Sequence, residues 1–125
     1  MTGNRPESRG FTLLELMVVL AIIALLLTIA APRYFVHVDR AREAALKQTL
    51  FVVRDALDKF QADKGRLPDS LDELVSERYL RQRPVDPMTD RSDTWLIVTD
   101  GEGKIQDLHS GSGSLAGDGS RHADW

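Results

Sequence analysis

A single carboxylate inside an apolar run is the group in this sequence that most clearly invites a chemical role. Glu15 lies five residues after Gly10, in a segment 11–31 whose only other polar residues are Thr12 and Thr28. A charge near bilayer depth costs roughly 2.5–3.5 kcal/mol on insertion scales, so it is usually functional and usually paired. The sequence therefore raises the question of which cation Glu15 meets.

The apolar run has the length of a membrane span. A helix from Phe11 to Ala31 is about 31 Å long at a rise of about 1.5 Å per residue, which matches a hydrocarbon core of about 30 Å. A cleaved secretory signal is an alternative, since the leader is basic, but the run is long and a carboxylate at its front is unusual for a signal. A plain membrane anchor leaves Glu15 unexplained.

The segment from Gly10 to Glu15 resembles the processing motif of type IV prepilins, which type IV pilins share with type II secretion pseudopilins. A short polar leader, Gly10, Phe11, Glu15 and a following span coincide. The resemblance implies that residues 1–10 are a leader, removed between Gly10 and Phe11 by a prepilin peptidase, and that Phe11 is then N-methylated. Gly10 has no side chain and so suits a tight peptidase pocket.

The same resemblance implies a partner for Glu15, namely the free amine of Phe11 on a neighbouring subunit. Electrostatics favours this pairing, because opposite charges attract far more strongly in lipid than in water and a lone buried carboxylate is costly. The alternative is a Glu15 held at the membrane interface with no partner.

The distribution of arginines leaves the orientation in the membrane open. Arg5 and Arg9 favour a cytoplasmic N-terminus, whereas Arg33, Arg40 and Arg42 beyond the span argue the other way. The resemblance implies a single-pass protein of the inner membrane with a periplasmic C-terminal head.

The helix is expected to continue past the membrane segment 11–32 to about residue 64. Pro32 removes one backbone hydrogen bond, so we expect a kink there, with a helix end as the alternative. Beyond it, apolar residues recur at spacings of four and three, which indicates a helix with one buried face. Gly65 is the candidate C-cap. The residues of this stripe are Leu46, Leu50, Val53, Leu57 and Phe60.

The head, residues 33–125, is predicted to add a short helix and a β-hairpin. Ser70 and Glu73 fit a capping box, which opens a helix over 70–78. The composition of 94–109 predicts two antiparallel strands. Asp86 is interpreted as a turn acceptor or a ligand. The predicted fold class is therefore α+β and type IV pilin-like, with a long N-terminal helix packed on a small antiparallel sheet.

The glycine-rich tail, 110–125, is predicted to fold back with Trp125 as its anchor, because a tryptophan is costly to leave in water. It resembles the C-terminal loop of the major, G-type pseudopilin of type II secretion, which binds calcium through two aspartates and backbone carbonyls. Asp118 and Asp124 are the matching positions, although the loop is shorter than usual. Calcium would then stabilise a head that has no cysteine.

Two alternatives for the tail remain open. In the first, Asp118 belongs to a turn and Asp124 is a surface charge. The second, zinc held by His109, His122 and the aspartates, fits common zinc spacings poorly.

The functional prediction is a structural subunit and not an enzyme, since no nucleophile, phosphate loop or paired-carboxylate pocket is recognisable. Across 125 residues with a formal net charge of −3, no basic stripe suggests nucleic acid. The resemblance implies a pseudopilin that polymerises with other pseudopilins into a periplasmic pseudopilus driving type II secretion. A prepilin peptidase and an inner-membrane secretion platform are the implied partners. The alternatives are a type IV pilin or minor pilin, used in adhesion, twitching or DNA uptake, and an anchored binding domain that never polymerises.

Overall fold

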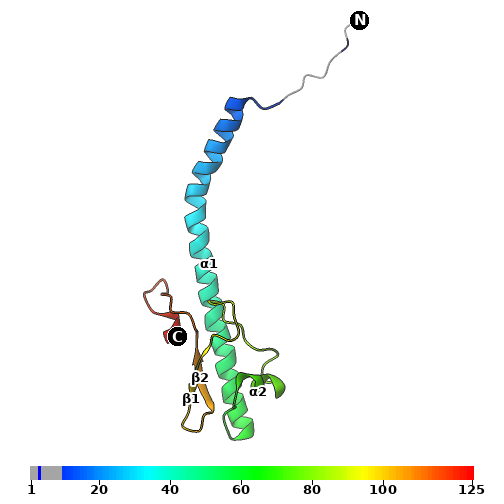
Figure 1. Ribbon diagram of the computed structural model, residues 1–125, viewed down its shortest axis with the longest axis vertical. Coiled ribbons are helices and arrows are strands. Elements are labelled where there is room, and N and C mark those ends of the chain that lie inside the picture. Colours follow the sequence, from blue (N-terminus) through cyan, green and yellow to red (C-terminus); the bar gives the residue numbers. More distant parts are fainter. Residues whose placement is uncertain (1–2, 4–9) are drawn as a thin grey trace. The chain divides into compact units, whose positions relative to one another are not determined.

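The computed structural model describes Gly3 and residues 10–125, and its elements follow the predicted order (Figure 1). They are α1 (Leu13–Lys64), α2 (Leu71–Ser76), β1 (Leu96–Thr99), β2 (Ile105–His109) and a short 3-10 helix, η1 (His122–Asp124). The predicted α+β class, a long helix with a small antiparallel sheet, is confirmed. The chain divides into two compact units, Met1–His37 and Val38–Trp125, and each is described by itself.

Both ends of α1 are explained by local backbone chemistry. The helix begins at Leu13, two residues later than Phe11, because Thr12 acts as its N-cap: the Thr12 Oγ1 accepts a hydrogen bond from the Glu15 N–H at 3.1 Å. At the other end Gly65 adopts a φ of +70° and donates its N–H to the Gln61 carbonyl at 2.9 Å. The helix continues through Pro32, so it does not end there; the kink stays a prediction.

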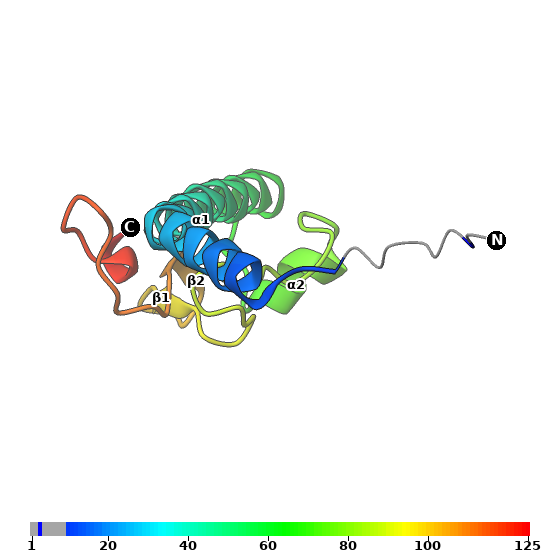
Figure 2. The ribbon, with the colours of Figure 1, turned by 90° about the horizontal axis from the view of Figure 1, so that it is seen from above.

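The head unit forms around one buried face of α1. All five residues of the predicted stripe are buried, together with Ala56. They pack with residues of α2 and the hairpin, whose buried members include Leu71, Leu74, Ile105 and Leu108. The hairpin, α2 and the tail therefore gather around the C-terminal part of α1, and seen from above the hairpin lies between the tail and α2 (Figure 2).

The hairpin has a defined register with one irregularity. Leu96 pairs with His109, Ile97 with Leu108 and Val98 with Asp107, while Thr99 pairs with Ile105. One residue of β2 is therefore left without a partner between the last two pairs, which is the signature of a β-bulge. The bulge allows both Ile105 and Leu108 to be buried although their spacing does not fit strict alternation.

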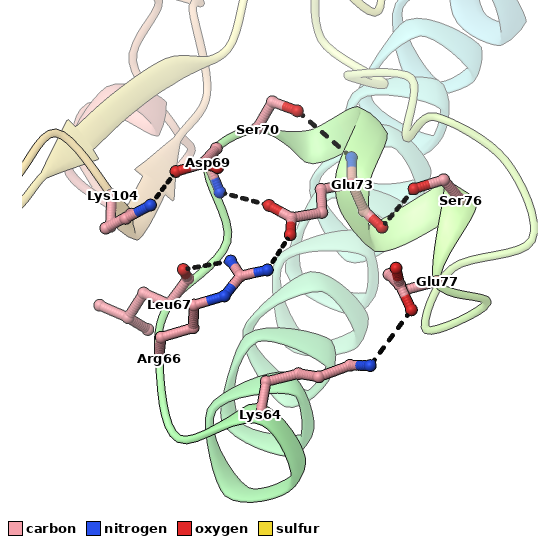
Figure 3. A network of polar contacts seen from close by, with 9 residues as sticks. All are labelled: Lys64, Arg66, Leu67, Asp69, Ser70, Glu73, Ser76, Glu77 and Lys104. Atoms are coloured by element: carbon pink, nitrogen blue, oxygen red, sulfur yellow. Dashed lines mark hydrogen bonds and ion pairs between the residues drawn. The ribbon is translucent and has the colours of Figure 1, made fainter.

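The start of α2 is held by a network of side chains that extends the predicted capping box (Figure 3). The Ser70 Oγ accepts the Glu73 N–H at 3.2 Å, as a capping serine does. The Glu73 carboxylate accepts the N–H of Asp69 and the Arg66 guanidinium, each at 2.6 Å, in place of the Ser70 N–H. These two hydrogen bonds, that from Arg66 first, lower the pKa of Glu73. Lys104 contacts Asp69 and so links the network to the hairpin.

A buried carboxylate ties the loop after α2 to the beginning of the tail. Asp86 is completely buried and accepts three hydrogen bonds: from the Met88 N–H at 2.9 Å, the Ser110 hydroxyl at 2.6 Å and the Gly111 N–H at 3.1 Å. Three donors offset the loss of water around a buried charge. Of the two interpretations of Asp86, the structure therefore supports the turn acceptor.

The tail approaches the segment just before β1 so closely at this point that only glycine fits. A Cβ on Gly111 would lie 2.0 Å from the carbonyl oxygen of Thr94, well inside van der Waals contact. The absence of a side chain at Gly111 lets its N–H reach Asp86.

We predict that Asp86→Asn lowers the free energy of unfolding of the head by about 2–4 kcal/mol, because an amide cannot accept from all three donors and leaves one of them unsatisfied. Asp90→Asn is the matched control. That side chain is 73% exposed, and asparagine tolerates the left-handed φ of 56° found there, so a change within about 0.5 kcal/mol is expected. Urea unfolding of the full chain in detergent, followed by tryptophan fluorescence, measures both variants. Equal stability of the two would contradict the account of Asp86.

Candidate functional site

The predicted processing site lies in non-helical chain immediately before α1. Gly10, Phe11 and Thr12 are exposed and outside the helix, and the Phe11 side chain is 84% exposed. The bond between Gly10 and Phe11 is therefore outside the hydrogen-bonded helix. Apart from Gly3 and Gly10, the predicted leader 1–10 lies outside the described residues.

Glu15 lies in the first turn of α1, three residues after the cap. The arrangement Thr12-x-x-Glu15 has the spacing of a capping box, a signal that the sequence analysis missed. A carboxylate in this turn also interacts favourably with the positive end of the helix dipole. Within the part of the chain that the structure describes, Glu15 forms no ion pair. Its pairing with a Phe11 amine stays a prediction.

The N-terminal part of α1 presents apolar side chains on every side. It is long and apolar enough to cross a membrane, and none of its most apolar stretch is buried within the chain. The large side chains from Leu13 to Ile29 are all more than two-fifths exposed. A helix that is apolar all round requires lipid or other helices as its surroundings, so this unit is a membrane anchor whose surface is also available to neighbouring helices.

In the head unit the tail folds back onto α1, and Trp125 anchors it as predicted. The Trp125 carbonyl accepts a hydrogen bond from the Arg54 guanidinium at 2.6 Å, and the indole Nε1 donates to the Ser120 Oγ at 2.8 Å. The Lys47 ammonium lies 4.6 Å from the indole centroid, a cation–π contact. Two cations of α1 therefore hold the last residue of the tail.

Arg54 also joins α1 to β2. It donates to the Asp107 Oδ1 at 2.9 Å and to the Leu108 carbonyl at 3.2 Å. Burial raises the pKa of Asp107, but hydrogen bonds from the Leu108 N–H and from Arg54 outweigh it, so the pKa lies below its ordinary value. Sequence reasoning gave no signal for Arg54, because its partners lie more than fifty residues away.

A second polar contact between α1 and the tail is made by His122. Only 2% of its side chain is exposed, and its two ring nitrogens face Glu43 of α1 at 3.1 Å and Ser114 at 2.8 Å. Its ring packs edge-on against Trp125, with centroids 4.9 Å apart. Both ring nitrogens of His122 therefore lie within hydrogen-bond distance of protein groups, whereas the Nδ1 of His109, the other histidine of the zinc alternative, has no hydrogen-bond partner among the described residues.

Of the two predicted calcium ligands, Asp118 lies in a turn of the tail and Asp124 at the end of η1, and each has a local partner. The Asp118 Oδ1 accepts from the Ser120 N–H and hydroxyl, at 3.0 and 2.6 Å, and the Asp124 Oδ2 accepts from Arg121 at 3.2 Å. One oxygen of each carboxylate has no such bond among the described residues. Over that same part of the chain, no group of three or more acidic, histidine or cysteine side chains could hold a metal. A calcium ion here would fit only with backbone carbonyls and water as its other ligands.

Comparison with known families supports the interpretation of the N-terminus. Residues 5–31 match the prokaryotic N-terminal methylation motif. The matched region contains Gly10, Phe11 and Glu15 and most of the apolar part of α1.

Similarity to curated proteins extends over the head as well. The type II secretion system core protein G of Klebsiella michiganensis is 27% identical, over 98% of this chain and 96% of that protein. Core protein G of Klebsiella pneumoniae is 31% identical, over 65% of this chain and 69% of that protein. Competence protein ComGC of Bacillus subtilis is 32% identical, over 80% of this chain and 98% of that protein.

No solved structure matches the chain at a comparable level of significance. The methylation motif, the long apolar helix with its single early carboxylate, and relatives that are matched over most of their length nevertheless agree. The chain belongs to the type IV pilin superfamily, and within it the chain is a pseudopilin.

Proposed function

We propose that this pseudopilin polymerises into a periplasmic pseudopilus that drives protein export by a type II secretion system. The observation that carries the proposal is the similarity to a type II secretion core protein G along almost the whole chain, head included. The proposed role of the chain is structural. In support of it, the polar side chains described in the head form hydrogen bonds between one segment of the chain and another.

The proposed assembly step depends on the charge of Glu15. Cleavage between Gly10 and Phe11 by a prepilin peptidase would create an amine two residues before the start of α1. A subunit in the bilayer then carries a carboxylate in its first helical turn, and the amine of a neighbouring subunit neutralises it. Charge pairing in a low-dielectric medium sets the register, while the exposed apolar side chains of α1 supply contact area.

The proposal places the span in the inner membrane and the head in the periplasm. Growth of the filament would require a subunit to leave the bilayer at the inner-membrane secretion platform and join the other pseudopilins. Once Glu15 is neutralised, only apolar surface moves from lipid to protein in this transfer. The free-energy cost is small, because lipid tails are as apolar as the neighbouring helices.

A second candidate is a type IV pilin or minor pilin that serves DNA uptake. It is favoured by the match to ComGC, which covers almost all of that shorter protein. Both candidates share the processing and assembly steps. They differ in what the filament moves, so loss of secreted proteins or loss of transformation in a strain lacking the gene separates them.

We predict that Glu15→Gln strongly reduces polymerisation while leaving processing intact. Glutamine keeps the size and the helix propensity of the side chain but cannot neutralise an amine, so the critical concentration for assembly should rise at least tenfold, which corresponds to about 1.4 kcal/mol per subunit. Sheared filaments are quantified by sedimentation, and mass spectrometry of the N-terminus establishes processing. The matched control is Glu102→Gln, an exposed residue of the hairpin turn.

Two results would oppose this proposal in different ways. Wild-type protein that retains Met1 in cells with a prepilin peptidase would exclude the processed-pseudopilin function as a whole. A processed Glu15→Gln protein that polymerises as the control does would exclude only the charge-pairing step.

We also propose that the tail binds calcium through Asp118 and Asp124, with backbone carbonyls and water completing the six to eight oxygens that calcium requires. The support is the likeness of the tail to the calcium loop of major pseudopilins and the free carboxylate oxygen that Asp118 and Asp124 each retain among the described residues. Bound calcium would stabilise the docking of the tail, in which Arg54, Lys47 and His122 already take part.

For calcium, we predict that the melting temperature of the full chain in detergent rises by several degrees when a chelator is replaced by saturating calcium. A ligand at a hundred times its Kd stabilises by about 2.7 kcal/mol. Asp118→Asn and Asp124→Asn should each remove the rise, whereas the exposed Asp58→Asn should keep it. An unchanged melting temperature for the wild type would exclude the site.

A further inference from the structure

A basic and aromatic segment just beyond the span has no role in the assembly step. Arg33, Tyr34 and Phe35 directly follow the apolar run of α1, and the two aromatic side chains are 65% and 64% exposed. Their rings contact each other edge to face, with centroids 5.8 Å apart. Arg33 is exposed and has no ion pair with any residue that the structure describes.

The length of the span fixes the depth of this segment. From Leu13 to Ala31 the helix is about 28 Å long at about 1.5 Å per residue, close to a hydrocarbon core of about 30 Å. With Leu13 at one boundary of the hydrocarbon core, Glu15 lies about 3 Å inside it, and Arg33 and Tyr34 lie at the other boundary, at the level of the lipid headgroups.

Arginine and tyrosine side chains are suited to the headgroup level of a bilayer. Tyrosine is enriched at membrane interfaces, where its ring is in contact with lipid and its hydroxyl with water. A guanidinium binds phosphate with two parallel hydrogen bonds. Basic residues on the exported side of a span oppose the usual charge bias, and Arg33 is the one that lies at the headgroup level.

We propose that Arg33 binds the phosphate of an anionic phospholipid in the periplasmic leaflet, with Tyr34 and Phe35 packed at the interface beside it. This proposal rests on the proposed function, because it requires a membrane-spanning α1 with a periplasmic head. The contact holds the subunit at one depth until it joins the filament. One basic residue near an anionic surface raises membrane association about fivefold, so the contact resists extraction without preventing it.

The test is dipolar dephasing between arginine carbon and lipid phosphorus in the full chain. The protein, labelled with 13C at arginine Cζ, is reconstituted into phosphatidylcholine vesicles with and without phosphatidylglycerol, and 13C–31P dephasing is recorded. Arg33→Gln should lower the dephasing by the contribution of one arginine, with the larger loss in vesicles that contain phosphatidylglycerol. Arg78→Gln, an exposed residue of the head, is the matched control and should change nothing.

The outcomes distinguish a failure of the lipid contact from a failure of the proposed membrane-spanning function. Equal dephasing for Arg33→Gln and the wild type, in protein that resists carbonate extraction, overturns the lipid contact alone. Such a result would also be obtained if Arg33 bound a carboxylate of a second copy. Wild-type protein that carbonate removes from the vesicles overturns the membrane-spanning role and the lipid contact together.

Discussion

Placing the Glu15 carboxylate in lipid, at the start of an apolar helix, carries a free-energy cost that governs how this chain can assemble. Glu15 lies in the first turn of α1, where the Thr12 cap fixes the beginning of the helix and the helix dipole partly offsets the negative charge. Neither the cap nor the helix dipole neutralises the carboxylate in lipid as a counter-ion would. A subunit alone in the bilayer is therefore less stable than one beside a free amine, and polymerisation relieves that difference.

The head is a small domain that must be stabilised without disulfides, because the sequence contains no cysteine. Polar side chains make the connections. Asp86 joins the loop after α2 to the tail, and Arg54 joins α1 to both β2 and Trp125. Each is a charged group whose hydrogen bonds go to several segments at once, so the removal of one group loosens more than one element.

The sequence predicted the features that depend on local pattern. The apolar stripe from Leu46 to Phe60 is the buried face of α1, and the glycine after Lys64 ends the helix. The apolar run places the start of α1 two residues early, because the run does not mark Thr12 as the cap. Glu73 was expected to bond back to Ser70 but accepts from Asp69 and Arg66, a choice set by how the preceding loop folds. Contacts between distant segments, such as Glu43 with His122, leave no periodic signal and could not be predicted.

The pairing of the Phe11 amine with Glu15 of a neighbouring subunit corresponds to a distance that can be measured in the filament. Filaments are assembled from a mixture of subunits labelled with 15N at phenylalanine and subunits labelled with 13C at the glutamate carboxyl carbon, and the 15N–13C dipolar coupling is measured between them. The expected coupling corresponds to an ion pair within about 4 Å and is absent from the same mixture of subunits before assembly. Filaments that form without any such coupling would contradict the pairing.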